Sequence, residues 1–168
     1  LARHLPGNAG NAETIDWLYS LGSAKSNCHF TRGDFDEAPS MTETKVVSIE
    51  VLELESFRAL DSSMGRSRSI GSCLKELDCD ILVSGHTHKH FIHVHDGKYF
   101  INPGSATGAY SALSSSNQPS FILMAIQGED VSAFVYTMKG EEMNVSRIDF
   151  SKNGEILQDA RAAEEEET

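Results

Sequence analysis

The sequence predicts an α/β fold, built as a sandwich of two sheets with flanking helices. A short apolar run at Ile81–Val83, ending in Ser-Gly, is typical of a buried strand. Apolar residues at helical spacing between 70 and 77 directly precede it, which gives the strand, helix, strand order of a parallel layer. From residue 120 onward, apolar alternation broken by short turns predicts antiparallel strands.

Composition and charge limit the classes of function. At 168 residues with 39% hydrophobic residues, the chain is long enough for one domain with a real core. A formal charge of −11 argues against nucleic acid, and no apolar run is long enough to span a bilayer. Three cysteines without a CxxC pair indicate reduced, structural thiols. We therefore expect a cytosolic protein that reaches membranes only through partners.

The chain divides unequally into a domain and a tail. Residues 1–150 form the predicted domain, and 151–168 form an acidic, disordered tail that serves solubility. The opening residues 1–8 include no initiator Met and predict no strand of their own, so we expect the natural beginning to be missing. Asn11 is a predicted cap for a helix from about Ala12 to Leu21, with Ile15, Leu18 and Tyr19 near one face.

The next part of the chain predicts two strands and a carboxylate-rich turn. Residues 28–37 are read as a short strand leading into a Gly-Asp turn, where Asp34, Asp36 or Glu37 could bridge metals. Alternation from Lys45 to Val51 predicts a half-buried strand. From Leu52 the apolar residues fall on the opposite side of the strand. Residues 55–69 show no regular spacing of apolar residues, so we expect a loop there.

A hairpin and three further strands complete the predicted elements. Residues 89–95 and 98–101 alternate on either side of Asp96-Gly97, a type I′ turn signal. His90, His93 and His95 are then exposed strand residues rather than ligands. The later strands are predicted at 120–127, 130–138 and 143–150.

The most informative polar residues are His86 and His88, which follow the strand at Ile81–Val83. If the chain stays extended there, both imidazoles reach one side and can bind a metal such as zinc, manganese or iron. Alternatively, they are two solvated loop histidines. The loop 102–108 follows a neighbouring strand and is either a buttress that hydrogen-bonds to this site or an ordinary turn.

Three motifs carry a resemblance to a known family: Arg32-Gly-Asp-Phe-Asp-Glu37, Val83-Ser-Gly-His-Thr-His88, and the long run from Tyr99 through Asn-Pro-Gly-Ser-Ala-Thr-Gly-Ala to Tyr110. Together they resemble the small retromer subunits, a branch of the calcineurin-like metallophosphoesterases. The similarity covers roughly residues 6–50 and 70–150. It implies a two-sheet α/β sandwich of the metallophosphoesterase type, here missing its first strand.

The resemblance also implies a metal centre. By motif, Asn8, Asp34, His86 and His88 correspond to the family's ligands, although Asn8 is alternatively a simple turn residue. The family's Asp-x-His and Gly-His motifs have no counterpart, which implies weakened binding of zinc or manganese. Because the second of these is expected within 55–69, that stretch resembles a product of an altered transcript or gene model. Phe35 stands where active enzymes of this fold carry a His, which implies loss of catalysis.

The implied function is that of a non-catalytic scaffold in endosome-to-Golgi retrograde protein transport. The former metal-site face would dock a large α-solenoid retromer subunit, and the protein would be cytoplasmic and peripheral to the endosome membrane. Leu123, Phe134, Tyr136 and Val145 match the family's hydrophobic patch for regulatory partners; alternatively they are core. A weak metal-dependent phosphoesterase and a non-functional variant are the other two hypotheses.

Overall fold

The computed structural model describes residues 3–7, 9–21, 28–33, 36, 41–42, 44–49, 52–57, 79–111, 118–152 and 156–159. Its elements, in chain order, are β1 (Arg3–Pro6), α1 (Ala12–Ser20), β2 (Cys28–Thr31), β3 (Thr44–Ile49), β4 (Leu52–Phe57), β5 (Ile81–Ser84), β6 (His90–His95), β7 (Lys98–Pro103), β8 (Ser120–Gln127), β9 (Asp130–Lys139), β10 (Glu142–Ser151) and β11 (Ile156–Asp159).

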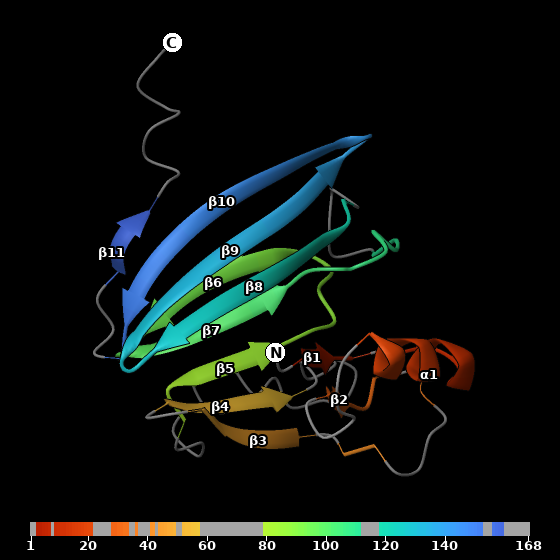
Figure 1. The fold of residues 1–168 in the computed structure, drawn as a ribbon, viewed down its shortest axis with the longest axis horizontal. Coiled ribbons are helices and arrows are strands. Elements are labelled where there is room, and N and C mark those ends of the chain that lie inside the picture. Colours follow the sequence, from red (N-terminus) through yellow and green to blue (C-terminus); the bar gives the residue numbers. More distant parts are fainter. Residues whose placement is uncertain are drawn as a thin grey trace, which may run out of the picture.

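Two sheets form the layers of the sandwich within these residues (Figure 1). One has the strand order β3-β4-β5-β7-β6 and contains parallel β4–β5 and β5–β7 pairs. The other, β11-β10-β9-β8, is antiparallel throughout. A separate parallel pair, β1–β2, lies beside α1 at one end of the five-stranded sheet (Figure 1). The predicted α/β sandwich is confirmed.

The main core fills the space between the two large sheets. Leu54 and Ile81 from one sheet meet Val131 and Ala133 from the other, all almost completely buried. Alternation along β9 explains this, because every second residue points inward. The ring of Tyr99 stacks on Phe150 at 4.0 Å, and the Tyr99 hydroxyl donates to the Ser151 carbonyl at 2.8 Å. The sheets are thus joined by burial and by a hydrogen bond.

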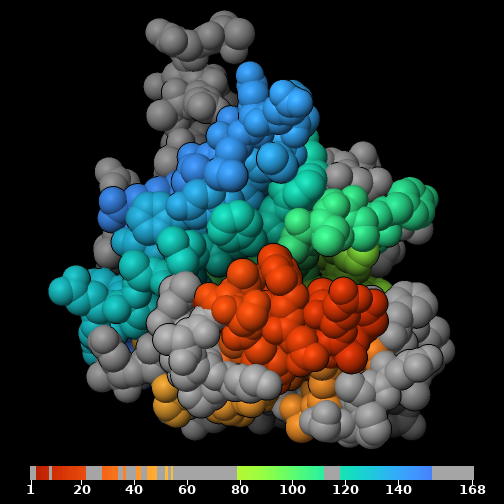
Figure 2. All heavy atoms as spheres, turned by 45° about the vertical axis from the view of Figure 1, so that its right-hand side comes forward, coloured from red at the N-terminus to blue at the C-terminus, as the bar shows by residue number. Residues whose placement is uncertain are grey.

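The helix α1 forms as the sequence predicts. The Asn11 Oδ1 atom accepts from the Thr14 amide at 2.9 Å, which caps the helix. Ile15, Leu18 and Tyr19 pack over a small cluster with Cys28 and Phe30 from β2. Figure 2 shows α1 (orange-red) on the surface, with the four-stranded sheet (teal to blue) above it. This packing fixes the helix over the β1–β2 pair.

The hairpin β6–β7 also matches its prediction. Asp96 and Gly97 have φ angles of 51° and 75°, and a type I′ turn needs positive φ at both positions. The predicted strands in the second half of the chain are confirmed as β8, β9 and β10, and Cys28 and Cys79 are buried cysteines outside any disulfide.

Three predictions about elements are wrong. The break in apolar alternation at Leu52 marks the start of the second strand of a β3–β4 hairpin, in which Ile49 lies opposite Leu52. Residues 55–57 are therefore strand and not loop. The opening residues contain β1, whose hydrogen bonds depend on β2, 25 positions away. Part of the predicted tail forms β11, because β10 offers it an unpaired edge. The predicted helix at 70–77 lies outside the described residues.

Candidate functional site

The carboxyl ends of three strands converge beside α1. The Gly7 amide, directly after β1, donates to the Thr31 carbonyl at the end of β2, at 3.3 Å. Gly85, directly after β5, approaches the same place so closely that a Cβ there would overlap the carbonyl oxygen of Pro6. Only a glycine permits this contact. The segments that carry the predicted ligands therefore leave their strands at one edge, where α/β folds build their sites.

Asp36 ties two of these segments together. Its carboxylate accepts hydrogen bonds from the amides of Ala9 at 3.0 Å, Gly10 at 3.1 Å and Gly33 at 2.9 Å. Three amide donors satisfy a carboxylate without a metal ion. Asp36, one of the three acidic residues considered as bridging ligands, is thus engaged as a clamp between the start of α1 and the turn after β2.

His86 and His88 lie in a turn and not in an extended segment. Their φ angles are 76° and 57°, in the left-handed region, so the argument from strand alternation is wrong. The Nδ1 atom of His88 lies 2.8 Å from the Ala109 carbonyl oxygen. Because a carbonyl only accepts, Nδ1 carries a proton, so Nε2 is the ring nitrogen left to bind a metal. This is the arrangement typical of a metal-binding histidine.

Asn102 supports this turn from β7. It is fully buried, and its amide nitrogen donates to the Gly85 carbonyl at 3.0 Å and to the Thr87 hydroxyl at 3.1 Å. Its oxygen accepts from the Gly104 amide at 2.9 Å. The predicted buttress is confirmed at Asn102, which lies near the end of β7 and holds the Gly85 carbonyl and the Thr87 hydroxyl on either side of His86.

The predicted ligands are only partly described. Asn8 and Asp34 lie outside the described residues, although their described neighbours Gly7, Ala9 and Gly33 belong to the converging segments. Within the described ranges, no group of three or more His, Cys, Asp or Glu side chains is placed to hold a metal ion. His88, with its fixed tautomer, fits a metal such as zinc, and His86 lies in the same turn.

Sequence reasoning missed a second pair of histidines. His4 on β1 and His29 on β2 are register partners, with ring centroids 4.8 Å apart. Both ring nitrogens of His4 are buried without a hydrogen-bond partner. Burial, followed by His29 and Lys45, lowers the pKa of His4 to about 4. Residues 25 apart become neighbours only through strand pairing, so no local pattern indicates this pair.

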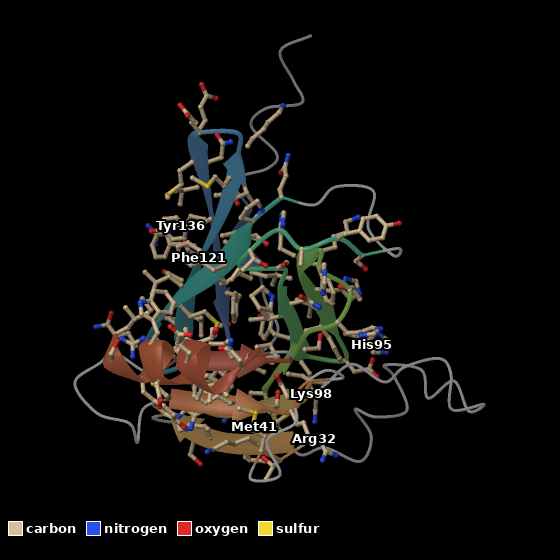
Figure 3. The ribbon with its side chains drawn as sticks, turned by 90° about the vertical axis from the view of Figure 1, so that its right-hand side faces the viewer. Arg32, Met41, His95, Lys98, Phe121 and Tyr136 are labelled. Carbon is tan, nitrogen blue, oxygen red and sulfur yellow. The ribbon has the colours of Figure 1, made fainter. Side chains whose placement is uncertain are left out.

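The residues of the predicted hydrophobic patch lie on the outer face of the four-stranded sheet. Leu123 is 39% exposed and Val145 52%, whereas Phe134 and Tyr136 are half-buried. Phe121, which the sequence analysis missed, stacks flat on Tyr136 with ring centroids 4.6 Å apart. Figure 3 shows both rings on the side of their sheet that faces away from the five-stranded sheet. We call the set of Phe121, Leu123, Phe134, Tyr136 and Val145 the outer strip.

A polar cluster borders the outer strip. Arg147 lies over the Phe134 ring, 5.6 Å from its centroid, and donates from Nε to Asp149 at 2.9 Å. Ser132 donates to the same carboxylate at 2.6 Å. The hydrogen bond from Ser132, which has the larger effect, and the one from Arg147 both lower the pKa of Asp149. The outer face therefore changes from apolar to polar along the strands.

Comparison with known families agrees with this geometry. The sequence model of the Calcineurin-like phosphoesterase superfamily domain matches residues 5–129. The chain therefore belongs to the calcineurin-like phosphoesterase superfamily. Within the superfamily it is a Vps29-type protein, as the following relatives show.

The structure of Vps29 from Entamoeba histolytica complexed with zinc has 36% sequence identity and a TM-score of 0.78, covering 88% of this chain and 81% of that one. Chaetomium thermophilum Vps29, complexed with the cyclic peptide RT-D3, has 26% identity and a TM-score of 0.69, covering 89% and 79%. Vacuolar protein sorting-associated protein 29 of Schizosaccharomyces pombe is 42% identical over 82 residues. That match spans 46% of this chain and 44% of the curated relative.

No helix among the described residues is long and apolar enough to cross a membrane.

Proposed function

We propose that this chain is a scaffold subunit of retromer in endosome-to-Golgi retrograde transport, peripheral to the endosome membrane through its partners. The observation that carries the proposal is the outer strip. An exposed aromatic ring, Phe121, stacked on the half-buried Tyr136 beside exposed aliphatic residues is typical of protein docking, and hydrolysis of a phosphate ester gives such a surface no role. Membership of the Vps29 type supports the same function.

The second docking surface is the edge formed by the converging loops. Tyr110 is 78% exposed and adjoins Ala109, the residue whose carbonyl holds His88. An exposed aromatic residue on a loop fixed by hydrogen bonds is a suitable anchor for a large α-solenoid subunit. The buried amide of Asn102 keeps this surface in shape without requiring catalysis.

Calorimetry of the full chain with the C-terminal half of a large retromer subunit, with and without zinc, tests this surface. We expect Tyr110→Asp to weaken binding at least roughly tenfold, since aromatic anchors carry much of the energy of an interface. Leu123→Lys, on the outer strip, serves as the control and retains affinity. Equal loss in both variants, or unchanged binding by Tyr110→Asp, contradicts docking at the loops.

The outer strip is proposed to bind regulatory proteins through apolar side chains. The cyclic peptide RT-D3, bound by the Chaetomium Vps29, is a practical probe. We expect Leu123→Lys to abolish peptide binding, because it places a charge beside the stacked rings. Gln127→Lys is the matched control: it adds the same charge on the same strand and face, opposite Asp130. If both variants bind equally, the strip is not the docking site.

Zinc or manganese fits the loops as a structural ion. His86 and His88 would hold it together with Asn8 and Asp34, and the ion would cross-link the segments that follow β1, β2 and β5. In the alternative function, a weak phosphoesterase, the metal would supply a hydroxide nucleophile. The fixed tautomer of His88 favours metal binding in either case. Hydrolysis of an aryl phosphodiester with added manganese discriminates between the structural and the catalytic role of the metal. Turnover that His88→Ala abolishes supports the enzyme.

A further inference from the structure

The outer face of β9 and β10 ends in a pair of methionines. Met138 and Met143 are directly opposite each other in the β9–β10 register. They lie two positions beyond Tyr136 and Val145, so alternation places them on the same face as the outer strip. The two thioethers therefore extend the outer strip towards the tip of the β9–β10 hairpin.

This pair is accessible to solvent. Met143 is 59% exposed and Met138 39%. The pairing of β8 with β9 ends at Ser120 opposite Thr137, and beyond it the Met138 amide donates to the Pro119 carbonyl at 2.9 Å, so the backbone of Met138 is held while its side chain stays exposed. By contrast, Met124 points to the inner face of β8 and packs against the core, and Met41 packs against the small cluster under α1.

We propose that Met138 and Met143 are a site of reversible oxidation by hydrogen peroxide, which switches off docking at the outer strip. The sulfur attacks one peroxide oxygen, the O–O bond breaks, and an S–O bond forms. The leaving hydroxide takes the proton from the transferred oxygen and departs as water. Sulfur is thereby oxidised by two electrons and the peroxide is reduced. A methionine sulfoxide reductase reverses the change.

The chemistry of the surroundings favours this oxidant. Hydrogen peroxide is uncharged, so the acidic turn residues Glu141 and Glu142 do not repel it. A sulfoxide is strongly polar, and two of them in one cross-strand row replace apolar surface with hydrogen-bond acceptors. A partner that covers the strip must then desolvate these acceptors. The consequence for binding rests on the proposed function, whereas the oxidation itself does not.

Timed treatment of the full chain with hydrogen peroxide, followed by peptide mass spectrometry, tests selectivity. We expect Met138 and Met143 to oxidise roughly tenfold faster than Met124 and Met41, because susceptibility follows exposure. Equal rates at these four of the five methionines in the chain overturn the proposal.

Retention on a phenyl column measures the change in surface. We expect the oxidised chain to elute earlier and to regain its retention after reductase treatment. The double variant Met138→Leu and Met143→Leu, which keeps the apolar row, should not shift with peroxide, whereas the matched control Met124→Leu should. Unchanged retention of the oxidised wild-type chain overturns the proposed switch.

Binding of the cyclic peptide separates this inference from the proposed function. Loss of binding on oxidation in the wild type but not in the double leucine variant supports the switch. Retained binding by the oxidised wild type overturns it. If the untreated chain does not bind the peptide, docking at the strip has failed, while the oxidation rates and the column still decide whether the pair is a selective site.

Discussion

The outer strip and the converging loops present side chains in opposite ways. The strip stands on three antiparallel strands in continuous register, and its residues point outward while the alternate residues form the core. The loops depend instead on buried polar contacts, such as those of Asn102 and Asp36, and on a close approach of two backbones at Gly85. Substitution in the strip should therefore change binding with little effect on folding, and substitution in the loops should change both.

The largest effect is expected for Gly85→Ala. The added Cβ would overlap the Pro6 carbonyl oxygen, and two backbones must separate to admit it. We expect a loss of about 3 kcal/mol in the free energy of unfolding, as for an overpacked core. Urea denaturation measures it. Gly140→Ala is the control, because a Cβ there meets nothing within 4 Å and only the positive φ is unfavourable. A Gly85→Ala variant no less stable than this control would show that the strand ends do not meet.

Asn102→Ala is the next perturbation of the loops. It removes the two hydrogen bonds that Asn102 donates to the His86–His88 turn and leaves the Gly104 amide without its acceptor, while the Gly85 carbonyl keeps the Thr87 amide as its donor. We expect a loss of about 2 kcal/mol of stability. Nitrogen-detected NMR should also show that His88 loses its single tautomer as the turn relaxes. A stable variant with an unchanged His88 spectrum would mean that Ala109 alone orients the ring.

Acid should weaken the β1–β2 pair. The pKa of His4 falls from its ordinary value of 6.5 to about 4 because the ring is buried, so the folded state binds a proton less readily than the unfolded state. The contribution of His4 is fully present above pH 6.5 and is lost as the pH falls towards 4. After discounting for partial exposure, we expect about 2 kcal/mol over this window.

The measurement is urea denaturation from about pH 7 to about pH 4, in steps of roughly one pH unit. His4→Phe should flatten the profile, and replacement of the exposed His95 by Gln should leave it unchanged. A profile that is equally steep in His4→Phe would assign the acid sensitivity to other groups.

The smallest effect on folding is expected in the strip. Phe121→Ala removes one ring from the stack with Tyr136, which is worth about 1 kcal/mol beyond burial. Peptide binding should fall far more than stability does. A variant that unfolds readily would show that the ring supports the sheet and is not primarily a docking group.

The difference between these two regions also explains what sequence reasoning found. The β6–β7 hairpin was predictable because Asp96-Gly97 specifies its own turn, and β8 to β10 follow from alternation and short turns. The clamp by Asp36 and the pairing of His4 with His29 join residues about 25 positions apart, so no local pattern indicates them. The β3–β4 hairpin was missed because its two strands were read as one strand with a phase error.

The order of strands in the four-stranded sheet has a consequence for folding kinetics. β8, β9 and β10 are neighbours both in the chain and in the sheet, so each pairing closes only a short turn. The parallel pairs behind the loops must close far longer segments, for example between Leu54 and Ile81. The entropy cost of closing a loop rises with the length of the loop. We therefore expect the antiparallel strands β8, β9 and β10 to pair before the parallel strands do. A nascent chain would then display its apolar strip before its loop edge exists, which makes early capture by a partner or a chaperone useful.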